Sequence, residues 1–269
     1  MLKPPVADCP ACQPFRMEGA GGITSLTQKS GLQRIIAGLV LFSAAFGYAE
    51  AAVVAYLRHI YDPIRAHFYR RLAGELFPLL TLNQLESLGP EHILLLKIEL
   101  GRELATLLML AGVALVAARR KREWLAAFLI CFGIWDITFY MFLKLLLHWP
   151  ASLLTWDILF LIPVPWAGPV IAPILVSVSM IAGGVCVLYR EHNHNQVHLT
   201  AWRWALIFLG GAAIVAAFMW DFRNTAKGGN PNPFNWLLFA AGEATAIGAL
   251  ATSLRTGRQR GAVEQRSQM

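Results

Sequence analysis

The stretch "KIELGRELATLLMLAGVALVA", residues 97–117, combines two properties that decide how the whole chain is interpreted. It belongs to an apolar window, residues 91–118, that exceeds the roughly 20 residues needed to cross about 30 Å of hydrocarbon. Four charged residues nevertheless stand within seven positions at its start: Lys97, Glu99, Arg102 and Glu103. The window predicts a transmembrane helix, and the charges within it require an explanation.

Apolar windows of similar length recur along the chain. Five more are found at residues 34–57, 124–147, 168–189, 201–220 and 235–254. The chain is 57% hydrophobic and only 14% charged, which is typical of a protein that meets lipid on most of its surface. The sequence therefore predicts an all-α fold, a polytopic membrane helix bundle of about six transmembrane helices.

The distribution of Lys and Arg predicts the orientation. Fourteen of these cations fall on the side of the two termini and six on the opposite side, so the positive-inside rule places both termini in the cytoplasm. The net charge of +7 is assigned to lipid head groups, and nucleic-acid binding is not expected. The expected location is a bacterial-type inner (plasma) membrane, with a multi-pass topology and no cleavable signal peptide.

The chain divides into three expected parts. Residues 1–31 form a mobile cytoplasmic tail, residues 32–254 the six-span membrane domain, and residues 255–269 a basic cytoplasmic tail. The first tail contains "CPAC" (Cys9 and Cys12), which is half of a tetrahedral zinc site or a redox pair, although an incidental thiol pair is the favoured interpretation.

A second histidine- and asparagine-rich segment raises the same question. "REHNHNQVH" places three imidazoles on the cytoplasmic side: His192, His194 and His198. Such a group could bind Zn, Cu or Ni, but a short polar connection that happens to contain histidines is the favoured interpretation.

Two connections on the outer side carry structural signals. In residues 58–90, apolar residues spaced four apart (Ile64, Phe68, Leu72 and Leu76) predict an outer interfacial helix, or a helix that merely caps the bundle. Five prolines between residues 150 and 173 predict a broken or re-entrant segment, because helix breaks at membrane depth require protein or water to satisfy the backbone.

The charges inside the spans converge on one depth. At about 1.5 Å per residue, five carboxylates from four spans lie roughly 10 to 18 Å below the outer boundary: Glu50, Glu99, Glu103, Asp136 and Glu243. Asp136, Tyr140 and Lys144 share one helix face, and Asp157 and Asp221 lie near the outer rim. The sequence predicts an acid-rich pocket that opens outward.

The expected substrate- or ion-binding residues of that pocket are Glu50, Glu99, Arg102, Glu103, Asp136, Tyr140, Lys144, Asp157, Asp221 and Glu243. The opposing hypothesis is a set of structural ion pairs, Glu99 with Arg102 and Asp136 with Lys144 through Tyr140. Acidic side chains outnumber basic side chains in this layer. Carboxylates without a basic partner in lipid must be neutral, metal-bound or hydrated. A binding pocket is the favoured interpretation, and a hard divalent cation such as Mg or Ca is a candidate cofactor.

No catalytic fingerprint accompanies these charges, so catalytic residues are not assigned and enzymatic activity stays open. The favoured function is binding or acting on a lipid-linked or periplasmic substrate, with Glu or Asp as acid or base and Arg102 or Lys144 holding an anionic group. The alternatives are a small ion- or proton-coupled transporter and an accessory subunit of a membrane complex. The expected partners are the lipid bilayer and a lipid-linked or small-molecule ligand; protein partners are not identified.

Overall fold

The computed structural model describes residues 20–69, 75–193, 197 and 199–267. Six helices in these residues are long and apolar enough to cross a membrane. They are α1 (Ala20–Phe68), α3 (Pro90–Ala117), α4 (Lys121–Leu147), α5 (Ile171–His192), α6 (Ala201–Phe218) and α8 (Trp236–Ser267). The prediction of a helical, multi-pass membrane protein is confirmed, and the six expected windows coincide with these helices.

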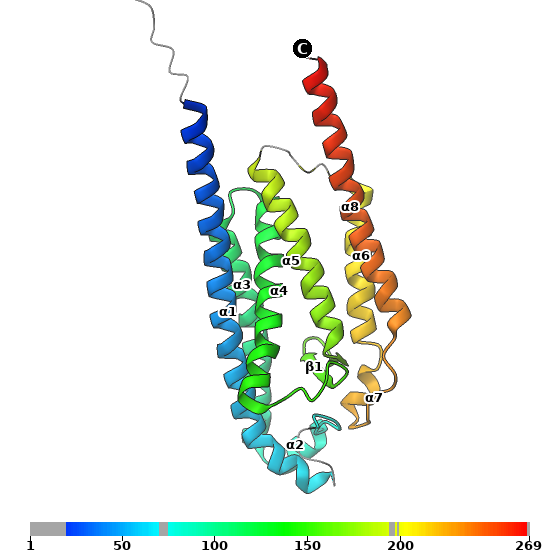
Figure 1. Ribbon diagram of the computed structural model, residues 1–269. Coiled ribbons are helices and arrows are strands. Elements are labelled where there is room, and N and C mark those ends of the chain that lie inside the picture. The colour runs from blue at the N-terminus through cyan, green and yellow to red at the C-terminus, as the bar shows by residue number, and fades with distance from the viewer. Residues whose placement is uncertain (1–19, 70–74, 194–196, 198, 268–269) are drawn as a thin grey trace, which may run out of the picture.

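The helices lie side by side in one bundle (Figure 1). The start of α1 and the end of α8 lie at one end of it, the upper end in this view, which we call the terminal end. The short helices α2 (Leu82–Leu88) and α7 (Phe222–Ala226) lie at the other end, which we call the α2 end. α4 is central, because it packs against α1, α3 and α5, whereas α6 packs mainly against α8.

Local sequence explains where several helices begin and end. Thr81 caps α2 and forms a capping box with Gln84, in which each side chain accepts a hydrogen bond from the other residue's amide. Pro90 occupies the first turn of α3, where its missing N–H costs nothing. His148, with φ of 53°, ends α4 in the left-handed region.

Glycine permits the closest helix contacts. A Cβ atom on Gly184 of α5 would lie 2.6 Å from the carbonyl oxygen of Ala126 on α4. The crossing of α6 with α8 is similar, because a Cβ on Gly210 would lie 2.6 Å from the carbonyl oxygen of Gly242. In lipid, where helix association depends on close packing, such small residues let two backbones approach.

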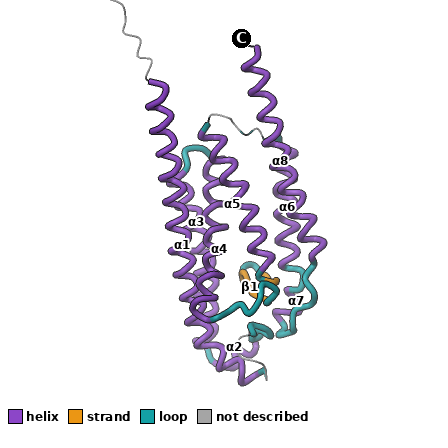
Figure 2. The backbone as a smooth tube through the Cα atoms, in the orientation of Figure 1, coloured by secondary structure: helices purple, strands orange, loops and turns teal. Residues whose placement is uncertain are grey.

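The proline-rich connection between α4 and α5 is not helical. It contains a two-stranded antiparallel hairpin of β1 (Trp156–Phe160) and β2 (Trp166–Pro169), seen as the two strands in Figure 2. Two prolines, Pro163 and Pro165, lie in its turn, where no ladder hydrogen bond is required of them. The turn projects among the helices, since the amide of Leu161 reaches a side chain on α3.

The connection between α1 and α3 differs from the expectation of a separate helix over residues 58–90. Residues 58–68 continue α1 without a break, and the separate helix is the seven-residue α2. A continuous helix is favoured because residues 58–68 keep the apolar spacing of the span before them, and the internal Pro63 does not end it. Of the four apolar positions expected in one helix, Leu72 lies outside the described residues.

The chain ends also extend further as helix than the windows indicated. α1 begins at Ala20, within the segment expected to be a tail, and α8 continues through the basic segment to Ser267. Cys9 and Cys12 lie outside the described residues, and so do His194 and His198 of the histidine-rich connection.

Candidate functional site: a polar chamber at the α2 end

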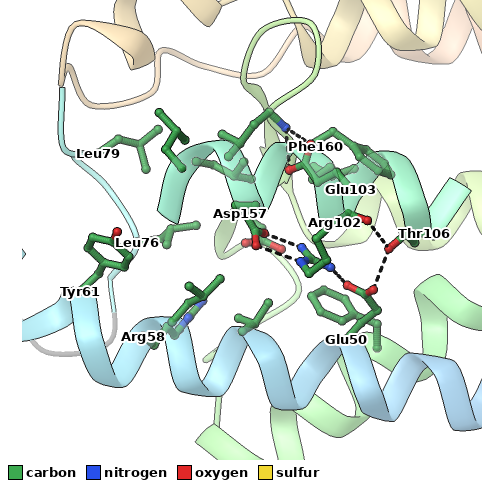
Figure 3. Close-up of a pocket in the computed structure, with 18 of the residues that line it drawn as sticks. Glu50, Arg58, Tyr61, Leu76, Leu79, Arg102, Glu103, Thr106, Asp157 and Phe160 are labelled. Atoms are coloured by element: carbon green, nitrogen blue, oxygen red, sulfur yellow. Dashed lines mark hydrogen bonds and ion pairs between the residues drawn. The ribbon is translucent and has the colours of Figure 1, made fainter. Parts of the chain in front are cut away.

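The bundle contains a cavity of about 300 Å³ near the α2 end, which we call the chamber (Figure 3). Its walls come from the second half of α1, the first half of α3, the second half of α4, strand β1 and the segment of residues 76–85. Six carboxylates line it, and so do three guanidinium groups. These are Glu50, Asp62, Glu99, Glu103, Asp136 and Asp157, with Arg58, Arg65 and Arg102.

Arg102 on α3 joins two of these carboxylates. Its Nη1 forms an ion pair with Glu50 of α1, and its Nε and Nη2 donate to the two oxygens of Glu99 at 2.9 and 2.5 Å. The hydroxyl of Thr106 donates to Glu50 Oε1 at 2.7 Å. Figure 3 shows Arg102, Glu50 and Thr106 pointing toward one another between α1 and α3. These contacts form a charged bridge between two spans, with one more acid than base.

Glu103 faces a different partner, although it follows Arg102 directly. Both of its carboxylate oxygens accept from the backbone amide of Leu161, each at 2.9 Å. Leu161 directly follows β1, so this bond fixes the turn of the hairpin against the middle of α3. The Glu103 side chain is buried, and the backbone N–H is a neutral donor, so the carboxylate charge is not balanced by this contact.

Two aspartates complete the wall near α4. Asp136 accepts from the hydroxyl of Ser177 on α5 at 2.8 Å, and Asp157 of β1 accepts from the hydroxyl of Tyr140 at 3.0 Å. Burial raises the pKa of Asp157 to about 6, although the nearby Arg58 and the Tyr140 hydroxyl favour the charged form. Asp157 thus changes charge near neutral pH, and the hairpin carries this group into the chamber.

The chamber also holds buried donors. Nε of Arg58 and Nε1 of Trp135 are buried without a hydrogen-bond partner among the described residues. The Arg58 guanidinium lies 3.9 Å from the centre of the Trp149 ring, a cation–π contact that fixes its position. Buried donors without a partner are uncommon, and here both belong to side chains that line the chamber.

The α2 side of the chamber combines leucines with a charged pair. Four leucines line it from the segment that precedes and includes α2: Leu76, Leu79, Leu80 and Leu85. Beside them, Arg65 pairs with Asp62 at 3.1 Å and also donates to the backbone carbonyl of Glu75. The α2 side of the chamber therefore offers both hydrocarbon and charge.

Seven of the ten predicted site residues line this chamber: Glu50, Glu99, Arg102, Glu103, Asp136, Tyr140 and Asp157. The other three do not. Lys144 is exposed and donates to the carbonyl of Pro150 at 2.9 Å, Asp221 accepts from the amide of Asn232 at 2.8 Å, and Glu243 accepts from Ser179 of α5 at 2.8 Å.

The structure pairs only some of the charges as the ion-pair hypothesis expected. Glu99 and Arg102 are paired, whereas Asp136 bonds Ser177 and not Lys144, because the Lys144 side chain turns outward from α4. Arg102 is held by two carboxylates and is not available to bind an anion in the expected way. The residues described here contain no group of three or more His, Cys, Asp or Glu side chains that could hold a metal ion.

Several lining residues were not among those predicted: Arg58, Tyr61, Asp62, Arg65, Thr106 and Trp135. A signal for two of them was present in the sequence. Thr106 follows Arg102 by four positions, and Arg58 follows Glu50 by eight, so each shares a helix face with a predicted residue. Asp62 and Arg65 lie beyond the expected end of the first span, which is why depth alone excluded them.

The chain matches no protein-family model, no curated protein and no solved structure in the comparisons with known proteins. Its function is accordingly inferred from the geometry of the chamber.

Proposed function

We propose that the chain is a binding protein of the plasma membrane that accepts a lipid-linked or periplasmic substrate from the outer side, with a hydroxyl-bearing polar head in the chamber. The observation that carries this proposal is the joint presence, in one cavity, of six carboxylates and of buried donors on Arg58 and Trp135.

A hydroxyl-bearing head suits this lining because each hydroxyl both donates and accepts hydrogen bonds. It can donate to Glu103 and Asp136, and it can accept from Arg58 and Trp135. An anionic head is disfavoured, because the carboxylates of the lining outnumber its guanidinium groups by three. Arg102 and Lys144 are therefore not expected to hold an anionic group.

The leucines of the lining support the lipid-linked form of the substrate, because they offer apolar surface that favours the hydrocarbon next to a polar head. The hairpin contributes to the same picture. Leu161 meets Glu103 about 20 Å along α3 from Pro90 at 1.5 Å per residue, so we infer that the hairpin re-enters the membrane from the α2 end.

The orientation of the chamber follows from the positive-inside rule. Four consecutive cations, Arg119 to Arg122, lie in the connection between α3 and α4 and in the first turn of α4, at the terminal end, and such short basic segments face the cytoplasm. The α2 end then faces the outer side of a bacterial-type inner membrane, and both termini are cytoplasmic.

A second candidate function has its own support. In an accessory subunit, the bridge from Glu50 through Arg102 to Glu99 and the contact of Glu103 with the hairpin would only fix how α1, α3 and the hairpin are arranged. The deciding residue is Glu103, because Arg102 keeps both of its carboxylate partners when Glu103 changes.

The test compares Glu103→Gln with a matched control, Glu91→Gln, on the same helix. Glu91 is exposed and does not line the chamber. The two variants and the parent are reconstituted in lipid nanodiscs, and their melting temperatures are measured with an alkyl glucoside and with an alkyl phosphate of equal chain length. The glucoside should stabilise the parent and Glu91→Gln more than the phosphate does.

Glu103→Gln should melt like the parent without ligand, because the amide oxygen still accepts from Leu161, and should lose most of the stabilisation by the glucoside. Equal stabilisation of both variants, or greater stabilisation by the phosphate, contradicts the proposal. A parent that shows no glucoside effect, with a Glu103→Gln variant that melts like the parent, assigns the charges to the accessory-subunit function.

A further inference from the structure

A second cavity, of about 420 Å³, lies between α4 and α5 on one side and α6 and α8 on the other. We call it the groove. Its lining is almost entirely apolar and includes Phe128, Phe132, Met180, Ile207, Ile247 and Leu250. The polar side chains Asp136 and Glu243 also reach it, but hydrogen bonds from Ser177 and Ser179 engage both.

The groove and the chamber adjoin. Asp136, Leu159 and Phe160 line both cavities. Figure 3 shows Phe160 on the far side of the chamber from the α1 residues Glu50 and Arg58. β1 thus lies between the polar chamber and the apolar groove, and Leu159 and Phe160, at the end of the strand, line both cavities.

The groove is open because its helices do not close on each other. α5 and α8 touch only sparsely, whereas α4 with α5 and α6 with α8 pack extensively. Gly211 of α6 lines the groove, and a Cβ atom built on it meets nothing within 4 Å. Apolar cavities stay dry, and protein interiors otherwise pack densely, so a space of this size in a membrane favours hydrocarbon.

The groove is long enough for an extended chain. Along α4 its lining runs from Arg122 to Asp136, which is about 20 Å at 1.5 Å per residue and exceeds half of the roughly 30 Å hydrocarbon core. A chain that follows the groove from Asp136 ends near the terminal end of the bundle. A polar head attached to such a chain then lies beside Asp136, Leu159 and Phe160, at the boundary with the chamber.

We propose that the groove binds the aliphatic chain of the same amphiphile whose polar head occupies the chamber, so that the two cavities form one site divided by β1. The proposal rests on the proposed function, because it assigns the head to the chamber. The aliphatic chain is an acyl or isoprenoid chain, and the shared residues at β1 mark the point where head and chain join.

The test uses an alkyl glucoside that carries a diazirine at the end of its chain. After photolysis in nanodiscs, labelled residues are mapped by mass spectrometry in the parent and in Gly211→Leu, which fills the groove from a position with open space. Gly112→Leu on α3 is the matched control, since Gly112 is exposed, lines neither cavity and also has nothing within 4 Å of its Cβ. Ile247→Phe fills the groove from α8 and serves as a second variant.

The expected label falls on the groove segments of α4, α6 and α8 in the parent and in Gly112→Leu. It is lost, together with the thermal stabilisation by the probe, in Gly211→Leu and Ile247→Phe. Label spread over the outward faces of α3, or unchanged in both filled variants, overturns the inference and identifies ordinary surrounding lipid.

Failure of this inference is distinguishable from failure of the proposed function. If the groove is not labelled but Glu103→Gln still abolishes stabilisation by the glucoside, the head site stands and the groove inference falls. If the groove is labelled but Glu103→Gln changes nothing, the chain binds independently of the chamber. In that case the single divided site is refuted along with the proposed function.

Discussion

The two ends of α1, α3 and α4 are held together in different ways. Toward the terminal end, these helices share a cluster of buried apolar residues in which Leu39, Leu110, Ala114 and Ile130 are at most 2% exposed. Toward the α2 end, the same helices enclose the chamber, and α1 contacts α3 through Arg102 and its carboxylates, although α1 and α4 still share buried apolar residues there, such as Ala51 and Leu143. α1 and α3 therefore contact each other through buried apolar side chains in one half and through an ion pair in the other.

Under the proposed function, the apolar half contributes most of the stability and the charged half contributes the binding site. Helix association in lipid depends on close packing, since lipid is as apolar as the side chains it replaces, and the small residues of the terminal half supply that packing. The charged half gains little net stability from buried ion pairs, but it loses much when one partner is removed.

The largest effect is expected from Arg102→Met. This change leaves Glu50 and Glu99 without their shared cation, and the loss of one partner from a buried ion pair costs about 3–5 kcal/mol in unfolding free energy. The measurement is unfolding in detergent with increasing denaturant. A much smaller loss would mean that water already reaches these groups and that the chamber half does not depend on charge.

A rescue variant sharpens this prediction. With Glu50→Gln and Glu99→Gln added to Arg102→Met, no charge remains in the bridge, and Thr106 can still donate to the side-chain oxygen at position 50. Most of the lost stability should return. If the triple variant is as unstable as Arg102→Met, the defect comes from lost packing of the arginine and not from stranded charges.

An intermediate effect is expected in the terminal half from Gly184→Ala. The added Cβ would lie 2.6 Å from the carbonyl oxygen of Ala126, so α5 must move away from α4, at a cost of about 1–3 kcal/mol. The control is Gly112→Ala, which meets nothing within 4 Å and should gain up to about 1 kcal/mol from helix propensity. Equal effects of the two variants on the melting temperature would contradict packing by shape.

A further effect is a pH dependence at the hairpin. The pKa of Asp157 is raised by burial from 3.8 to about 6, so between these values the folded protein binds more protons than the unfolded chain. Stability should therefore decrease as pH rises through this range and then level off. Asp157→Asn should remove the decrease, because its amide still accepts from Tyr140 but does not titrate.

Asp221, outside the chamber, supplies a control of opposite sign. Burial alone would raise its pKa, but hydrogen bonds from Asn224 and Asn232 outweigh burial and lower it. Its contribution to stability is thus present above the ordinary aspartate pKa and lost as pH falls below it. Asp157→Asn should therefore remove the fall in stability between pH 3.8 and about 6, whereas Asp221→Asn should keep that fall and remove only the loss of stability below pH 3.8. Melting temperatures across both ranges test this, and disappearance of the fall between pH 3.8 and about 6 in Asp221→Asn would refute the assignment to Asp157.

The sequence by itself determined the six spans and the layer of charges. Hydropathy adds along a window, and depth follows from the fixed rise of a helix, so neither depends on which helices are neighbours. For the same reason the predicted residues on α1, α3 and the chamber face of α4 were found from depth alone. The pairing of Glu99 with Arg102 was also accessible, because residues three apart share a helix face.

Only the tertiary structure decided which of these charges meet. Lys144 and Glu243 lie at suitable positions along their helices, yet Lys144 is exposed and bonds Pro150, and Glu243 lies on α8, which packs against α6 and does not line the chamber. Arg102 finds Glu50 on another helix, and Glu103 finds a backbone amide of a hairpin that window hydropathy cannot resolve. Helix rotation and hairpin placement depend on packing between segments far apart in the chain, such as the glycine contacts of α4 with α5, and not on the sum of properties within one segment.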